Sequence, residues 1–188
     1  EIRKNLTLSY IKQHYGIDTN STQIIPRMVV VHWTKMNNFE EVYDLLNNET
    51  LSTERTDIQN ASLLNVSSHF LIDQKGHIFQ LLPLDTMARH TIGLNYNSIG
   101  IENIGGADDI DNLTDAQLEA NIKLIKYLSK MLPSIKYLIG HLEYQTFENT
   151  PLWKELDNNY RTKKVDPGMR FINAIRENIP NLKKEYSK

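Results

Sequence analysis

The chain has 188 residues, of which 40% are hydrophobic and 23% charged, with a formal net charge of -2, so we expect one globular domain with a sizeable core. The nearly even charge balance argues against nucleic acid or an anionic membrane surface as a partner. The absence of cysteine excludes disulfides, cysteine-type structural zinc and a thiol nucleophile, and no stretch approaches the roughly 20 apolar residues of a membrane-spanning helix.

The first part of the chain combines a polar lead-in with a buried strand and a helix. Residues 1–25 form the lead-in, with a short helix expected at Leu6–Ile11, and residues 26–188 form the main domain. The continuous β-branched run at Met28–Val31 is typical of a buried central strand. Apolar residues at helical spacing predict a helix over Phe39–Leu51.

A hairpin and a further strand are predicted in the middle of the chain. Two apolar runs, Val66–Ile72 and His77–Leu82, flank a polar tetrapeptide that ends at Gly76, which is typical of a hairpin turn. The run Ser98–Ile104 predicts the next strand and ends at two glycines.

The second half of the chain predicts two helices and one strand. Thr114 and Gln117 form a capping-box pattern that opens a helix, and Pro133 ends it. Ile135–Ile139 is a strand, and Phe171–Ile179 is a final helix that begins after Asp166-Pro167-Gly168. Strands mixed with helices, including one hairpin, predict a single α/β domain with a mixed central β-sheet flanked by helices. In the helix between Thr114 and Pro133, the face expected to be buried carries Leu118, Ile122, Ile125, Leu128 and Leu132.

Four of the six histidines give no strong indication of chemistry. His14 lies in the polar lead-in, and His77 follows a turn, where a surface position is expected. His69 lies within an apolar strand and is expected to be a core histidine satisfied by hydrogen bonds. His90 lies in a loop before Gly93 and is expected to line a cleft.

His32 and His141 each end a short apolar run that resembles a buried strand, where functional groups gather in α/β folds. Asp166 is a third metal-compatible side chain, in a loop stiffened by Pro167. Three such ligands with an open fourth position are typical of catalytic zinc. No spacing rule joins the three residues, so two buried and satisfied imidazoles are the alternative.

Two further side chains could take part in catalysis. Glu102 is an acidic residue in an apolar strand, where burial would raise its pKa and suit a general base. Its alternative is a strand-end glutamate that faces water. Lys164, two residues before Asp166, could place a cation beside a developing oxyanion, or be plain surface charge.

Five segments in a fixed order resemble the zinc-dependent N-acetylmuramoyl-L-alanine amidases of the type-2 amidase family, which includes peptidoglycan recognition proteins and phage lysozyme-like amidases. The similarity spans Pro26 to Ile179 and implies the fold of that family. It implies one Zn²⁺ ion on His32, His141 and Asp166. The segments are Val30–Thr34, Val66–Asp73, Asn97–Glu102, Gly140–His141 and Lys164–Gly168.

The resemblance also implies roles for residues around the zinc ligands. Glu102 would be the general base for the attacking water, and Lys164 would stabilise the tetrahedral intermediate. Substrate contacts are expected from His90, Arg89, Asn95 and Trp33. Residues 26–188 would then be the zinc amidase domain.

Three departures from the family pattern indicate which branch of the family this chain resembles. The recognition proteins and phage amidases carry a cysteine as third ligand and a tyrosine before the His69 position, whereas this chain has Asp166 and Ser68. It therefore resembles the bacterial amidase branch. Arg89 stands where a tryptophan is often found, and the loop between His141 and Asp166 is long and rich in aromatic residues, of which Trp153 is expected to pack onto the domain.

The function implied is hydrolysis of the amide between N-acetylmuramic acid, or its 1,6-anhydro form, and L-alanine of the peptidoglycan stem peptide. A peptidoglycan-binding module without catalysis is one alternative, and it would require a broken zinc site. A zinc hydrolase of another cell-wall amide is the other. Because the chain begins at Glu1 rather than Met, we expect that a leader or a tag was removed. The expected location is exported, periplasmic or bound to the cell envelope, with a cytoplasmic location as the alternative. A monomer is the default expectation.

Overall fold

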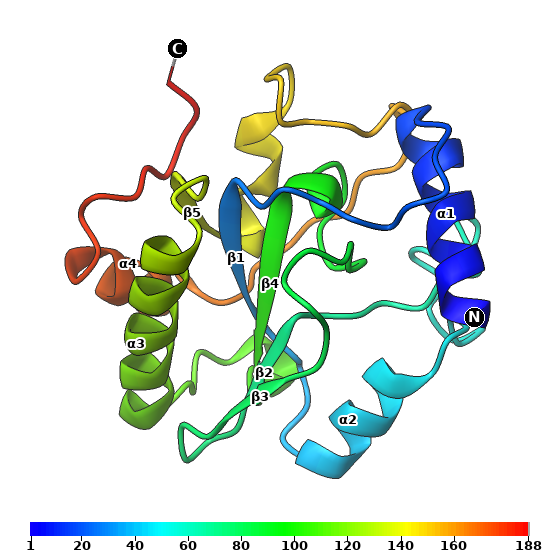
Figure 1. The fold of residues 1–188 in the computed structure, drawn as a ribbon. Coiled ribbons are helices and arrows are strands. Elements are labelled where there is room, and N and C mark those ends of the chain that lie inside the picture. The colour runs from blue at the N-terminus through cyan, green and yellow to red at the C-terminus, as the bar shows by residue number, and fades with distance from the viewer. Residues whose placement is uncertain (188) are drawn as a thin grey trace.

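The fold is organised by a five-stranded sheet in the order β3-β2-β4-β1-β5, seen in the computed structural model, which describes residues 1–187 (Figure 1). β1 pairs in parallel with β4 and β5, β2 pairs in parallel with β4, and β3 is antiparallel to β2. The predicted mixed sheet with one hairpin is therefore confirmed. The strands are β1 (Met28–Trp33), β2 (Phe70–Ile72), β3 (Ile78–Gln80), β4 (Ser98–Asn103) and β5 (Tyr137–Gly140).

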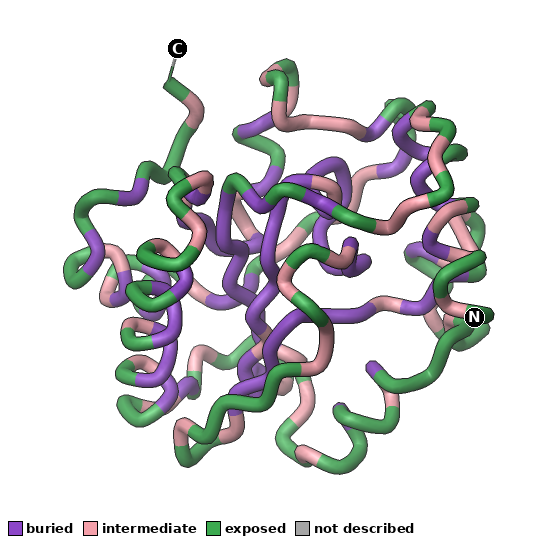
Figure 2. Tube along the Cα trace, viewed as in Figure 1, coloured by how far each residue is buried: buried purple, intermediate pink, exposed green. Residues whose placement is uncertain are grey.

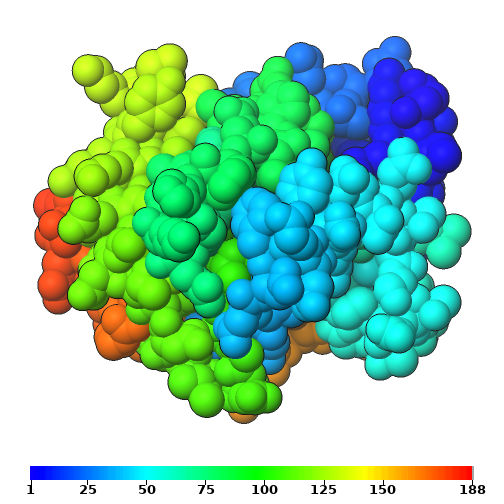
Figure 3. Space-filling view, turned by 90° about the horizontal axis from the view of Figure 1, so that it is seen from below, coloured from blue at the N-terminus to red at the C-terminus, as the bar shows by residue number. Residues whose placement is uncertain are grey.

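Helices cover both sides of this sheet. α3 and α4 lie together on one side, whereas α1 and α2 lie on the other (Figure 1). In the view from below, α2 lies between the β2–β3 hairpin and residues 48–64 (Figure 3). No helix within residues 1–187 is long and apolar enough to cross a bilayer. The helices are α1 (Ile2–Tyr15), α2 (Phe39–Asn47), α3 (Asp115–Met131) and α4 (Met169–Glu177).

Alternation along β1 decides which side chains face the site. Val29 and Val31 pack against α3 and α4, whereas Met28 and Val30 pack in the cluster that includes residues of α1. Because successive side chains of a strand point to opposite faces, His32 continues the second set. β1 and β2 are buried along their whole length and β4 and β5 along most of theirs, whereas the edge strand β3 is exposed (Figure 2).

Local signals fix the ends of several elements. The predicted capping box is present, because Thr114 Oγ1 accepts from the Gln117 N–H at 3.1 Å and Gln117 Oε1 accepts from the Thr114 N–H at 3.0 Å. The first helix is longer than predicted, and the strand predicted over Val66–Ile72 is shorter, because Ser67 pairs with Arg89 and not with a strand. The Ser67 N–H donates to the Arg89 carbonyl at 2.9 Å, and Ser67 Oγ accepts from the Arg89 N–H at 3.0 Å.

The N-terminal helix is tied to the rest of the molecule by His14, which is buried and not on the surface of a polar lead-in. Its Nδ1 lies 3.0 Å from both carboxylate oxygens of Glu155, and its Nε2 lies 2.9 Å from the carbonyl oxygen of Ala61. The imidazole thus joins α1 to two long loops. The division of the chain at residue 25 stays a prediction.

We expect His14→Ala to lower the free energy of unfolding by about 3–5 kcal/mol, because it leaves the buried Glu155 carboxylate with the Asp157 N–H but without its imidazole partner. Urea denaturation would measure this loss. In the double variant His14→Ala/Glu155→Ala, the loss should be smaller than the sum of the two single losses. If His14→Ala lowers the free energy of unfolding by less than about 1 kcal/mol, the pair of His14 and Glu155 stabilises the fold no more than a solvent-exposed ion pair does.

Candidate active site

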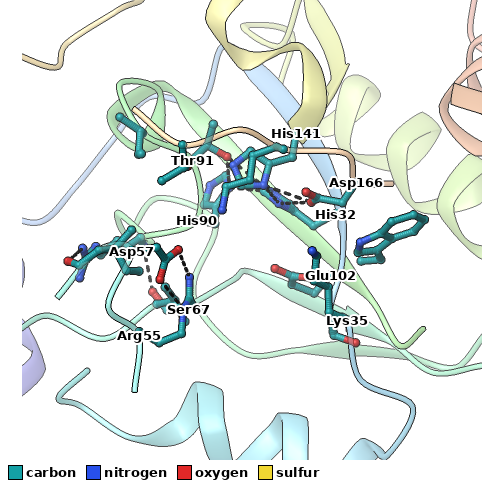
Figure 4. Close-up of a pocket in the computed structure, with 18 of the residues that line it drawn as sticks. His32, Lys35, Arg55, Asp57, Ser67, His90, Thr91, Glu102, His141 and Asp166 are labelled. Carbon is teal, nitrogen blue, oxygen red and sulfur yellow. Dashed lines mark hydrogen bonds and ion pairs between the residues drawn. The ribbon is translucent and has the colours of Figure 1, made fainter. Parts of the chain in front are cut away.

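A cavity of about 660 Å³ opens where β1, β4 and β5 end. This edge is where parallel α/β sheets place their ligands. His32, Glu102, His141 and Asp166 form one wall, and residues of the 48–64 segment form the wall across from them (Figure 4).

His32 and Glu102 come from neighbouring strands and are paired in register. His32 lies opposite Glu102 in the parallel β1–β4 ladder, so both side chains point to the same face of the sheet. Their separation is therefore set by the backbone hydrogen bonds of the sheet.

His141 follows β5 directly, and two contacts bring it to Asp166. A Cβ atom on Gly140 would lie 2.7 Å from Cδ of Pro167, so glycine is needed for the loop to approach the strand end. The Leu142 N–H then donates to the Asp166 carbonyl at 2.8 Å. The strand end and the loop are thereby held together.

Glu143 holds the turn that carries His141. One of its carboxylate oxygens accepts from the Gly140 N–H at 2.9 Å, and the other accepts from Arg176 of α4 at 2.9 Å. The sequence offered no pattern that predicts this pair.

The side chains of His32, His141 and Asp166 converge in a geometry that suits a metal ion. His32 Nδ1 lies 2.9 Å from His141 Nδ1 and 3.3 Å from Asp166 Oδ2, and the third distance, His141 Nδ1 to Asp166 Oδ2, is 3.1 Å. Zinc bonds of about 2.0–2.1 Å at tetrahedral angles place ligand atoms about 3.3 Å apart. The three residues therefore fit a zinc ion, and within residues 1–187 they are the one group of three such side chains whose ligand atoms all lie within 4.8 Å of one another.

The surroundings of His32 and Asp166 favour the protonation states that bind a cation. It lowers the pKa of His32 to about 4, with the charge of His141 adding to the effect, so His32 is neutral at pH 7. Burial alone would raise the pKa of Asp166, but the imidazoles of His141 and His32 hold it well below its usual range. A neutral imidazole and an ionised carboxylate are the forms that bind zinc.

Glu102 lies beside the cluster and points into the cavity (Figure 4). Its Oε2 is shielded from solvent and has no hydrogen-bond partner within the described chain. Burial, and then the charge of Asp166, raises the pKa of Glu102 well above its usual range. A carboxylate that is free of partners and has a raised pKa is suited to accept a proton near neutral pH.

Cationic side chains complete the cavity. Lys164 is half-buried, and burial lowers its pKa against the opposing effect of Asp166. Arg55 is bound in a fork to Asp57, at 3.0 and 3.1 Å, and both residues line the cavity. The sequence prediction missed Arg55 and Asp57, because the 48–64 segment carries no recognisable motif.

The residues that we expected to contact substrate differ in their surroundings. His90 lines the cavity, and its Nδ1 lies 3.0 Å from His32 Nε2. Arg89 also lines the cavity, but it is buried, and its guanidinium donates to the carbonyl of Ile58 at 3.2 Å and to the hydroxyl of Tyr160 at 2.9 Å. Its contact with substrate stays a prediction.

Asn95 and Trp33 are also engaged in the protein. Asn95 is fully buried, and its Oδ1 accepts from the N–H groups of His90 and Thr91 at 2.8 and 2.7 Å. Trp33 is in the cluster on the α3 and α4 side, where its ring packs over Gly106. Whether either residue touches substrate stays a prediction.

Three other residues behave as the sequence predicts. His69 is a satisfied core histidine, because its Nδ1 accepts from the Gly100 N–H at 3.0 Å and its Nε2 lies 2.9 Å from the Thr86 carbonyl. His77 is exposed. Trp153 packs against the core, with Arg161 over its ring at 4.6 Å.

Comparison with known proteins places this geometry in a family. The family model described as N-acetylmuramoyl-L-alanine amidase matches residues 20–169. No curated protein matches the chain in sequence.

Solved structures of amidases and of a recognition protein have a similar fold. The amidase LysC from Clostridium intestinale URNW is 22% identical, with a TM-score of 0.57 over 87% of this chain and 90% of that one. Drosophila peptidoglycan recognition protein SD is 16% identical, with a TM-score of 0.56 over 87% and 85%. The E. coli amidase AmiD, in complex with the substrate anhydro-N-acetylmuramic acid-L-Ala-D-gamma-Glu-L-Lys, is 20% identical, with a TM-score of 0.51 over 83% and 60%.

These structures establish the fold, and the family model covers most of the chain. The matched range contains the whole cluster of His32, His141 and Asp166 together with Glu102 and Lys164. The chain therefore belongs to the N-acetylmuramoyl-L-alanine amidase family.

Proposed function

We propose that the protein is a zinc-dependent hydrolase of the amide between N-acetylmuramic acid, or its 1,6-anhydro form, and L-alanine of the stem peptide. The observation that carries this proposal is the convergence of two imidazole nitrogens and one carboxylate oxygen beside an unpartnered glutamate. The family match and the fold shared with AmiD support the choice of substrate.

His32, His141 and Asp166 would hold one Zn²⁺ ion through His32 Nδ1, His141 Nδ1 and Asp166 Oδ2. Two neutral donors and one anionic donor leave a bound zinc ion with a net positive charge and an open position. When bound, such an ion lowers the pKa of water and polarises a carbonyl group.

The remaining groups of the site would move protons and stabilise charge. Glu102 Oε2 takes a proton from the attacking water, whose oxygen forms a bond to the amide carbon. The Lys164 ammonium would stabilise the negative charge that develops on the carbonyl oxygen. When the carbon–nitrogen bond breaks, protonated Glu102 returns its proton to the leaving nitrogen, which gives a carboxylic acid and the free amine of L-alanine.

We expect purified protein to release a peptide with a free N-terminal L-alanine from anhydro-muropeptides or from purified peptidoglycan, as measured by mass spectrometry of the products. A chelator should abolish the release and added zinc should restore it, because the ligand cluster holds the ion reversibly. Parallel incubation with both substrates would show which form is preferred.

Three other outcomes would contradict the proposal. Products cut at a different bond would identify a hydrolase of another cell-wall amide. Peptidoglycan binding without products would identify a binding module. Full activity in chelator would exclude a role for the metal. Location in the cell envelope and the monomeric state stay predictions.

A further inference from the structure

The two ring nitrogens of His32 face different surroundings. Nδ1 points to the ligand cluster, 2.9 Å from His141 Nδ1, whereas Nε2 lies 3.0 Å from Nδ1 of His90. A neutral imidazole carries one proton, on one nitrogen or on the other. His32 can therefore offer a lone pair to a metal only if Nε2 holds that proton.

A chain of hydrogen bonds determines where the protons lie, beginning at the carbonyl of Leu94, which can only accept. The Ser98 hydroxyl lies 2.8 Å from this carbonyl and donates its one proton there. Ser98 Oγ lies 3.2 Å from His90 Nε2, and because its own proton is already used, it accepts from His90. The proton of neutral His90 is thus on Nε2.

This arrangement leaves the Nδ1 atom of His90 as an acceptor. Because two lone pairs would repel each other at 3.0 Å, His32 Nε2 supplies the proton of this contact. The lone pair of His32 Nδ1 then lies in the ligand cluster, 2.9 Å from His141 Nδ1, which can donate to it. The Thr91 hydroxyl lies beside this contact, 2.9 Å from His90 Nδ1 and 3.4 Å from His32 Nε2.

The protein holds His90 in place for this contact. A Cβ atom on Gly100 would lie 2.8 Å from Cγ of His90, so the glycine in β4 leaves room for the ring. The Asn95 amide oxygen fixes the backbone of the loop by accepting from the His90 N–H. His90, His32 and Ser98 are all buried, so their hydrogen bonds are made within the protein.

We propose that His90 is a positioning residue that fixes the tautomer and the ring orientation of His32, so that the Nδ1 lone pair is ready for a metal. The inference rests on the proposed zinc site. His141 has no such support, because its Nε2 is buried without a partner in the described chain. His32 is therefore the pre-set ligand of the cluster. Outer partners of this kind typically contribute 10–100-fold to metal affinity.

The test compares His90→Gln with His90→Asn. The shorter asparagine places its amide oxygen near the position of Nδ1, where it can still accept from His32 Nε2. The longer glutamine places its amide near Ser98 and leaves His32 Nε2 with only the more distant Thr91 hydroxyl, at 3.4 Å, as an acceptor. We expect zinc affinity, measured by competition with a chromophoric chelator, to fall about 10–100-fold in His90→Gln and to stay close to wild type in His90→Asn.

A second measurement uses the metal-free protein. Nitrogen-15 NMR of the histidine rings should show His32 with its proton on Nε2 in the wild type and in His90→Asn, and a mixture of tautomers in His90→Gln. Equal zinc affinity in all three proteins, or an equal loss in both variants, would overturn the inference. A higher KM for muropeptide with unchanged zinc affinity would also overturn it, because it would show His90 to be a substrate contact. If the wild type itself binds no zinc, the proposed function fails. The NMR measurement on the metal-free protein still tests whether His90 fixes the tautomer of His32.

Discussion

Replacement of Glu102 by glutamine is expected to lower kcat by about 10²–10⁴-fold while the protein still binds zinc. Glutamine has nearly the same shape, but its amide cannot accept the proton of the attacking water. The carboxylate is well placed for that step, because its Oε2 is shielded and free of other partners. Steady-state kinetics on a muropeptide, together with metal analysis of the same preparation, would measure both effects. Near wild-type turnover would exclude Glu102 as the base.

The same variant separates catalysis from stability. Because the pKa of Glu102 is raised, the folded metal-free chain keeps a proton on this residue at pH values where the unfolded chain has lost it. The free energy of unfolding therefore falls as pH rises through that window. Glu102→Gln does not titrate, so it should melt at a higher temperature than wild type at pH 7, and the two should agree at about pH 3, below the unfolded pKa. Equal melting temperatures at both pH values would show that the folded structure does not raise this pKa.

Asp166→Ala is expected to weaken zinc binding by more than about 10²-fold, beyond the loss typical of an outer partner, and to abolish hydrolysis. The substitution removes the one carboxylate of the proposed ligand set and leaves two imidazoles. Isothermal titration with zinc would measure the affinity, and product analysis would measure the activity. An Asp166→Ala protein that keeps one tightly bound zinc ion would show that the ion is held elsewhere.

Two further variants sharpen that experiment. Asp166→Cys supplies a thiolate, which is also a zinc ligand, so we expect it to recover binding that Asp166→Ala loses. Asp57→Ala removes another carboxylate from the same cavity, one that is bound to Arg55 and is not part of the ligand cluster. It should leave zinc affinity unchanged. A loss of affinity in Asp57→Ala would indicate that Asp166→Ala acts through the general charge of the cavity.

Much of the sheet could be predicted from local patterns, because its strands are short apolar runs with clear turns. The β-branched run at Met28–Val31 and the capping box at Thr114 both correspond to the elements they predict. The strand predicted over Val66–Ile72 is shorter, because its first residues pair with the Arg89 loop, which is distant in sequence. The apolar character of a segment does not specify which other segment its backbone groups will hydrogen-bond.

In the candidate site too, residues with a local sequence pattern could be predicted, whereas contacts between distant residues could not. His32 and His141 could be selected because each ends a strand, and the resemblance to amidases joined them to Asp166. The contact of His90 with His32 joins the loop before β4 to β1, and the pairing of His14 with Glu155 likewise joins residues that are far apart in sequence. Neither contact has a local pattern, so neither could be predicted.

The pairing of His32 with Glu102 across β1 and β4 has a consequence for how this fold can diversify. If these residues have the proposed roles of metal ligand and base, the sheet ladder keeps the spacing between them whatever changes occur in the loops. Insertions and deletions in the 48–64 segment, which forms the opposite wall, can therefore accumulate and change which wall fragment is accepted. A single-residue deletion within β1 would instead turn His32 to the opposite face of the sheet. Selection can thus alter specificity gradually in this architecture, whereas a change in the register of β1 removes the chemistry in one step.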